Sequence, residues 1–192
     1  MGMGTDGCSK MTDIDVIRKY LKTQEPSYFS LLYQKYAGKI YGKCISLLKE
    51  EALAKDATQE IFIKIFMNLC KFEEQSKFST WVYSITYNYC IDTIRKKKKL
   101  KNIFSNDMEK APDLEDEVPD EKLLAMEVSR LKVVLDNMPP GDKAVLMMKY
   151  QDDMLIKEIA EALSKTESAI KMKIKRAKHK AQRVYKELYG AR

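Results

Sequence analysis

A run of cations along one predicted helix is the feature of this sequence whose spacing most clearly suggests chemistry. From Ser168 onward, apolar side chains recur four and three positions apart, which makes one apolar stripe on a helix. The cations lie away from that stripe: Lys171, Lys173, Lys175, Arg176, Lys178, Lys180 and Arg183. Such a helix packs by one face and offers cations to DNA on the other. A plain amphipathic helix with a solvated lysine face has the same pattern, so both interpretations stay open.

A shorter helix and a tight turn must position this cationic helix. Residues 157–163 predict the first helix and residues 164–167 the turn, with the small Ala160 where two helices would cross closely. Thr166 and Ser168 are placed to cap the second helix and to contact phosphate. This stretch therefore predicts a DNA-binding helix-turn-helix.

Composition limits the remaining possibilities. The chain has 192 residues, enough for one large or two small domains, and 45% of them are hydrophobic, which favours a real core. A formal net charge of +7 favours a polyanionic partner. The four cysteines form no C-x-x-C pair and His179 is the only histidine, so we expect no metal site. Cys44, Cys70 and Cys90 fall in apolar helical stretches and are expected to be buried free thiols. With no signal segment or membrane span, these features indicate a cytoplasmic protein.

Charge is segregated along the chain and indicates two domains. A basic block at 95–101 is followed by an acidic block at 107–121 that contains two prolines, which is the composition of a linker. We therefore expect a flexible tail at 1–10, a first domain at 11–100, an acidic linker at 101–122 and a second domain at 123–192.

The first domain is predicted to be entirely helical. Helices are expected from Thr12 or Asp13 through Leu21, from Pro26 or Ser27 onward, over 56–69 and over 80–95, with a polar loop at 70–79. No alternation of strand length competes with this pattern. The expected fold class is all-α, with two small helical domains.

Aromatic residues crowd the fourth of these helices, which ends in RKKKK. Trp81, Tyr83, Tyr87 and Tyr89 beside a cationic run suit single-stranded nucleic acid, because bases stack on rings while lysines meet phosphates. The alternative is that the rings are core, which we favour for Trp81 and Tyr89. Periodicity does not decide which of Tyr83 and Tyr87 faces outward.

The third helix opens with a polar group consisting of Asp56, Gln59 and Glu60, with Lys64 one turn later. Acids in a first turn are accounted for by the helix dipole alone. Paired carboxylates can also hold a metal, as in a nuclease, but no histidine or phosphate-binding loop accompanies them. We therefore expect no catalytic residue, cofactor or metal.

Four stretches, at 56–66, 77–99, 135–150 and 157–178, together resemble a bacterial RNA polymerase sigma factor of the extracytoplasmic function (ECF) group. The resemblance covers about 13–186. It implies an all-α protein with sigma region 2 in the first domain and region 4, a helix-turn-helix, in the second. It implies a promoter-specificity subunit, not an enzyme, whose partners are core RNA polymerase (β′ clamp and β flap), promoter DNA and an anti-sigma factor, with no small-molecule substrate. The alternative, a stand-alone helix-turn-helix regulator, accounts for the C-terminal half equally well but not for the aromatic–lysine helix.

The resemblance also assigns roles to residues. The residues implied to bind core polymerase are Asp56, Gln59, Glu60 and Lys64. Those implied to contact the −10 element are Phe72, Lys77, Phe78, Ser79, Trp81, Asn88, Arg95, Lys96, Lys97, Lys98 and Lys99. Those implied to contact the −35 element are Thr166, Ser168, Lys171, Met172, Lys175, Arg176 and Lys178. The segment 135–150 matches helices that support region 4 and touch the β flap.

This chain departs from the family pattern in three ways. Glu73 and Glu74 lie in the loop that is implied to hold a −10 base, which leaves its base preference open. The turn at 164–168 lacks the glycine often found there. Lysine largely replaces arginine at the implied DNA face, so base reading leans more on shape and phosphate contacts.

Overall fold

The computed structural model describes residues 11–101 and 128–190, and every regular element in these two ranges is a helix. We call residues 11–101 the N-terminal unit and residues 128–190 the C-terminal unit. The elements are α1 (Asp13–Thr23), α2 (Pro26–Leu48), α3 (Glu51–Asn68), η2 (Leu69–Lys71), α4 (Phe78–Lys101), α6 (Val128–Asp136), α7 (Pro140–Leu146), η3 (Met147–Gln151), α8 (Ile156–Ala162) and α9 (Glu167–Tyr189). The expected tail, and the expected linker beyond its first residue, lie outside the described residues. The all-helical fold class is confirmed.

Local signals set most of the helix starts. Thr12 caps α1 through a reciprocal box, in which Asp15 N donates to Thr12 Oγ1 and Thr12 N donates to Asp15 Oδ2, both at 3.2 Å. Pro26 occupies the first turn of α2, where its missing N–H costs nothing.

The predicted bounds of two helices were wrong. Helix α3 begins at Glu51, five residues before the expected start at Asp56. Helix α4 begins at Phe78 and continues to Lys101, so the basic block is helical rather than beyond the helix end.

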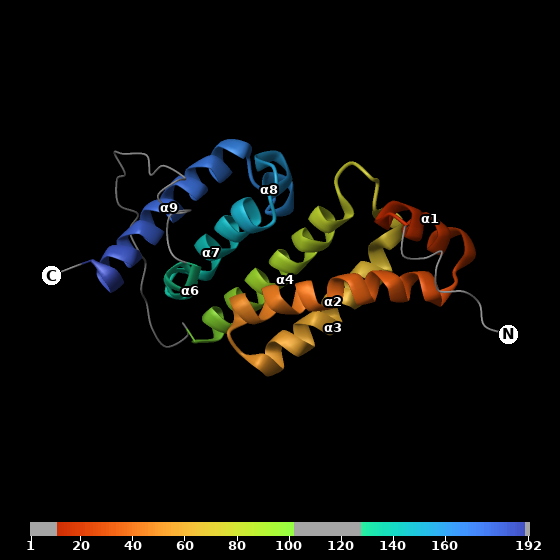
Figure 1. The fold of residues 1–192 in the computed structure, drawn as a ribbon, viewed down its shortest axis with the longest axis horizontal. Helices are drawn as coiled ribbons and strands as arrows, with labels where there is room; N and C mark the ends of the chain where they lie inside the picture. The colour runs from red at the N-terminus through yellow and green to blue at the C-terminus, as the bar shows by residue number, and fades with distance from the viewer. Residues whose placement is uncertain (1–10, 102–127, 191–192) are drawn as a thin grey trace.

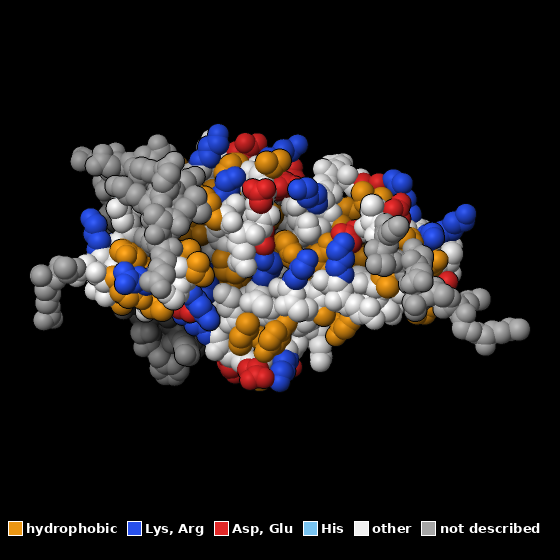
Figure 2. All heavy atoms as spheres, in the orientation of Figure 1, with side chains coloured by type: hydrophobic (Ala, Val, Ile, Leu, Met, Phe, Trp, Pro, Cys, Tyr) orange, Lys and Arg blue, Asp and Glu red, His pale blue; other side chains and the backbone are white. Residues whose placement is uncertain are grey.

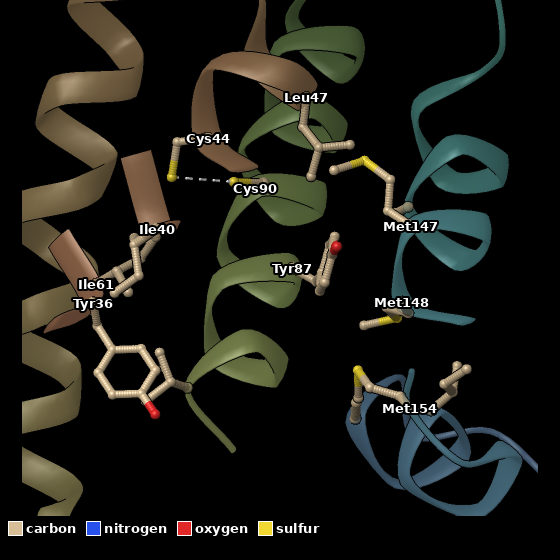
Figure 3. Close-up of a cluster of buried hydrophobic side chains, with 14 of the residues drawn as sticks. Tyr36, Ile40, Cys44, Leu47, Ile61, Tyr87, Cys90, Met147, Met148 and Met154 are labelled. Atoms are coloured by element: carbon tan, nitrogen blue, oxygen red, sulfur yellow. Dashed lines mark hydrogen bonds between the residues drawn. The ribbon is translucent and has the colours of Figure 1, made fainter. Parts of the chain in front are cut away.

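The N-terminal unit packs α2 against α1, α3 and α4. Its core includes Ile40, Ile61 and Val82, each 0% exposed. Cys44 and Cys90 are buried free thiols, as expected, with their sulfurs 3.7 Å apart between α2 and α4 (Figure 3). Cys70 was expected to be buried but is exposed, because it lies on η2 beyond the end of α3.

The C-terminal unit packs α7, α8 and α6 onto α9. The predicted stripe of α9 is confirmed at Ile170, Ile174, Ala177 and Ala181, which are all buried. Its predicted continuation is only partly buried at Val184 and is wrong at Leu188, which is 45% exposed. The turn from α8 to α9 has two hydrogen bonds, from Ser164 N to Glu161 O (3.1 Å) and from Lys165 N to Ala160 O (2.9 Å). These two bonds form a Schellman motif, in which Ser164 takes the left-handed φ of 51° that glycine usually supplies.

The two units pack against each other. Helix α4 lies between α2 and α3 on one side and α7 and α8 on the other (Figure 1). Tyr87 of α4, at 0% exposure, points toward Met148 of the C-terminal unit, and Leu47 of α2 points toward Met147 (Figure 3). Among the described helices, none is long and apolar enough to cross a membrane.

Candidate nucleic-acid interfaces

A cavity of about 490 Å³ opens between the end of α3 and the middle of α4. Its walls include the rings of Trp81 and Tyr89 and the carboxamide of Asn88, and three cations lie around it: Lys64, Lys71 and Lys96. Rings can stack on a base, the amide can bond a base edge, and ammonium groups attract phosphates. The cavity therefore combines the groups that hold an unpaired nucleotide.

Both rings of this cavity differ from their expected placement. Trp81 and Tyr89 were expected to be core, but each is only partly buried and lines the cavity. Of the two tyrosines whose direction the sequence left open, neither is exposed: Tyr87 is fully buried and Tyr83 is partly buried. The reason is that α4 packs on two sides, so its aromatic residues follow no single inward face.

Phe72 and Phe78 were expected at the DNA surface, and the structure buries them to 9% and 3% exposure. Their rings lie 5.3 Å apart at their centroids, and both pack on Trp81, at 5.6 and 5.7 Å. Aromatic pairs at this distance add to the burial energy of the rings. The two phenylalanines therefore pack against the ring of Trp81 and hold it in place, and their own rings are not open to solvent.

The loop before α4 is tied to α1. Glu74 accepts two hydrogen bonds from Arg18, from Nε at 2.9 Å and from Nη2 at 2.6 Å. The Glu74 hydrogen bonds, and then its charge, raise the pKa of Arg18. The ion pair holds the loop against α1, and the guanidinium of Arg18 offsets the negative charge of Glu74. Lys77 of the same loop is exposed and Ser79 is partly buried.

The basic end of α4 is exposed at Arg95, Lys96, Lys97 and Lys98. Arg95 pairs with Asp92 at 3.2 Å and Lys97 with Glu50 at 2.8 Å. The side chain of Lys99 lies outside the description. On the face in Figure 2, cationic side chains are spread widely and interrupted by acidic and hydrophobic groups. A basic site must therefore be located by residue rather than by overall charge.

A second exposed surface runs along α3. Asp56, Gln59 and Glu60 are exposed, and they lie in the middle of the helix, so the dipole of its first turn does not account for the acids. Ile63 and Met67 continue the same face, at 51% and 69% exposure. We call these five residues the α3 stripe. Its two apolar members were not predicted from the sequence, although Ile63 lies three residues after Glu60 and Met67 four residues after Ile63, which is the spacing of one helix face.

Lys64, grouped with these residues from the sequence, is exposed one turn after Glu60 and also lines the cavity beside α4, so its role at the polymerase stays a prediction.

The recognition-helix candidate α9 begins beside an exposed turn. Thr166 is its N-cap and accepts a hydrogen bond from Ala169 N at 3.2 Å. Lys171, Met172 and Arg176 are exposed. Two further residues of the predicted set complete this face, with Ser168 exposed and Lys175 partly buried.

Three lysines expected on the free face of α9 lie elsewhere. Lys178 is only 8% exposed, so its predicted place on the DNA face is wrong in this structure. Lys173 and Lys180 approach Asp142 of α7 at 4.0 and 3.7 Å. Helix α9 is thus covered by α7 and α8 over more than its apolar stripe, which narrows its exposed cationic face.

The sequence matches two family models, sigma-70 region 2 over residues 32–100 and sigma-70 region 4 over residues 129–180. It is 28% identical to the ECF RNA polymerase sigma factor SigW of Bacillus subtilis, over 88% of this chain and 95% of that protein. It is 27% identical to SigX of the same organism, over 83% of this chain and 82% of that protein.

Two solved structures share the fold. One is the sigma factor RpoE of Bartonella quintana in complex with the anti-sigma factor NepR, with a TM-score of 0.59, 16% identity, and 82% and 96% of the two chains covered. The other is CnrH in complex with the cytosolic domain of CnrY, with a TM-score of 0.60, 17% identity, and 90% and 96% covered. With both sigma-70 regions matched in order and ECF relatives aligned over most of its length, the chain belongs to the sigma-70 family, as a member of its ECF group.

Proposed function

We propose that this chain is a promoter-specificity subunit that binds core RNA polymerase and directs it to promoters. The cavity between α3 and α4 carries the proposal, because it joins two partly buried rings, the Asn88 amide and three lysines. We assign it to an unpaired base of the −10 element. A stand-alone duplex-binding regulator has no use for such a cavity.

The remaining surfaces fit the same function. The outer face of α9, with the exposed Lys171 and Arg176 and the partly buried Lys175, would read the −35 duplex in the major groove. The basic end of α4 would meet phosphates beside the melted bases. We assign the α3 stripe to the β′ clamp of the polymerase, since it joins carboxylates to exposed apolar side chains, as protein interfaces do.

In this function the chain binds the polymerase and positions it on promoter DNA, while the polymerase carries out the phosphodiester chemistry. It would therefore act in the cytoplasm with the polymerase and DNA. An anti-sigma factor is a further proposed partner, in line with the complex of the Bartonella sigma factor.

The test is reconstitution of the full chain with bacterial core polymerase. We expect co-purification and new transcripts from sheared genomic DNA, with permanganate-reactive thymines at the start sites. Asp56→Arg with Glu60→Arg should abolish co-purification, because it reverses both negative charges of the α3 stripe. Glu25→Arg with Glu187→Arg makes the same change in net charge at exposed positions off α3, and should leave assembly intact.

Normal co-purification of the α3 double variant would refute the clamp assignment. Binding of the wild-type chain to duplex DNA without any association with core polymerase would favour the stand-alone regulator.

A further inference from the structure

An ion pair ties the loop before α4, residues 72–77, to helix α1. Arg18 Nε and Nη2 donate to the two carboxylate oxygens of Glu74 at 2.9 and 2.6 Å, across 56 positions of sequence. Within the described ranges, residues 73–76 make no backbone–backbone hydrogen bond, and their other side-chain hydrogen bonds stay inside the loop. Figure 1 shows this loop reaching toward α1. The Arg18–Glu74 pair is therefore the polar contact that fixes the loop to another element.

Helix α1 gives this contact a firm base. Val16 and Ile17 are buried at 5% and 2% exposure, and α1 packs along α2. The guanidinium of Arg18 offers N–H groups in a fixed fork, so it sets the direction of the carboxylate as well as its distance. Glu74 has a left-handed φ of 57°, which an L-residue keeps only where its surroundings hold it. The pair thus constrains the backbone of the loop as well as its position.

The tethered loop leads to a ring that lines the α3–α4 cavity. Phe72 lies two residues before Glu74, and its ring packs on Trp81 at 5.6 Å between centroids. Phe78 packs on Trp81 too, at 5.7 Å, but it is also held by Tyr36 of α2, at 5.4 Å. Phe72 is therefore the support of Trp81 that depends on the loop. Displacing Glu74 would move Phe72 and loosen the Trp81 ring at the cavity wall.

We propose that Arg18 is a positioning residue for the −10 base site: through Glu74 and Phe72, it holds the ring of Trp81 in the orientation on which an unpaired base stacks. Arg18 does not line the cavity, so it acts only through the loop. The inference rests on the proposed function for the identity of the base, but the placement of the Trp81 ring can be measured without DNA.

Two other roles of Arg18 predict different results. A stabilising ion pair would lower Tm when broken, yet a pair with side chains 65% and 33% exposed contributes little to stability. A phosphate contact would weaken DNA binding when Arg18 is lost, but loss of Glu74 would then strengthen it. Positioning alone requires that loss of either partner, beyond the effect of its charge, loosen the Trp81 ring and weaken stacking.

The first measurement is the quenching of Trp81 fluorescence by acrylamide in the full chain. Trp81 is the only tryptophan, so the signal reports on the cavity wall directly, and a neutral quencher does not respond to the charge of the loop. Arg18→Glu and Glu74→Lys should each raise the quenching constant, with Tm unchanged. The double exchange restores an ion pair and the wild-type net charge, and should return the quenching constant toward the wild-type value.

Two control variants carry the same charge changes beside the tether. Lys22→Glu matches Arg18→Glu at an exposed position of α1. Glu73→Lys matches Glu74→Lys at the neighbouring loop residue, whose carboxylate is bonded within the loop. Both controls should leave the quenching constant unchanged. Should Arg18→Glu fail to fold by circular dichroism, Glu74→Lys against Glu73→Lys gives the same comparison.

The second measurement is the affinity for a short fluorescein-labelled single strand of random sequence. Glu74→Lys should bind it about two- to fivefold more weakly than Glu73→Lys, the factor by which an exposed ion pair can shift a two-state equilibrium. The two variants have the same net charge, so attraction to phosphates does not account for a difference between them. The double exchange should bind the strand as the wild type does.

A wild-type quenching constant in folded Arg18→Glu and Glu74→Lys, or equal strand affinities for Glu74→Lys and Glu73→Lys, would overturn the proposal. If both measurements give the expected results but the chain does not associate with core polymerase, the positioning role stands and the proposed function falls. Association with polymerase together with an unchanged quenching constant refutes the positioning role alone.

Discussion

Ser164→Gly should stabilise the chain, although it removes a side chain. Ser164 follows the C-cap of α8 with a φ of 51°, and its N–H and that of Lys165 close the Schellman motif. A left-handed conformation costs an L-residue roughly 1–2 kcal/mol. The greater freedom of glycine in the unfolded chain offsets roughly 0.5–1 kcal/mol of that. The net expectation is a gain of about 0.5–1 kcal/mol, with the turn geometry and the placement of α9 unchanged.

Thermal unfolding of the full chain by circular dichroism measures this gain. For a chain of this size, a gain of about 1 kcal/mol raises Tm by roughly 2–4 °C. Ala169→Gly is the matched control, since it puts glycine on the helical backbone of α9 three residues after the N-cap Thr166, where it costs up to about 1 kcal/mol. The two substitutions should therefore shift Tm in opposite directions. A lower Tm for Ser164→Gly, comparable to that of the control, would show that the left-handed turn is not strained.

Three further predictions concern DNA contacts and acid stability. Arg176→Ala should weaken promoter binding by about 1–3 kcal/mol if Arg176 contacts a base edge, and should leave the fold intact. Ile174→Asp should instead unfold the C-terminal unit, because it buries a charge. Transcription assays and circular dichroism on both variants test this contrast, and an unfolded Arg176→Ala variant would show that the wrong face of α9 was assigned to DNA. Lys96→Ala with Lys98→Ala should reduce the salt slope of DNA binding by about two units on a logarithmic plot, and an unchanged slope would exclude phosphate contacts. Hydrogen bonds from the N-cap Thr12 lower the pKa of Asp15 below its ordinary 3.8, so the stability that Asp15 contributes above about pH 4 is lost as the pH falls further. Urea unfolding midpoints measured from pH 2 to 6 should therefore fall less with acid in Asp15→Asn than in the wild type. Identical pH profiles for the two proteins would argue against this cap.

Periodicity predicted the helices well where one face is apolar and a cap marks the end. The stripe of α9 and the start of α1 are examples, since Ile170 and Ile174 are buried and Thr12 forms a capping box. The start of α3 was missed because Glu50, its N-cap residue, makes no side-chain capping bond. The first turns that follow, EALAK, also show no apolar stripe.

The site was harder to predict because its residues lie where helices from distant parts of the chain meet. Phe78 and Trp81 are three positions apart on α4, yet one is buried and the other lines the cavity. Lys178 has the composition of a surface residue, and only the packing of the C-terminal unit buries it. Lys43 and Asp152, 109 positions apart, carry no mark in the sequence of their pairing.

Methionine supplies much of the face that the C-terminal unit turns toward α2 and α4. Met147, Met148 and Met154 are buried there, at 6%, 0% and 1% exposure (Figure 3). Thioether side chains are unbranched and adapt to surfaces of different shape, so this face can fill the irregular surface that α2 and α4 present. Oxidation converts methionine to a polar sulfoxide. The contact between the two units thus shields three sulfurs from oxidants, and a sulfoxide at any of them would put a polar group into an apolar interface.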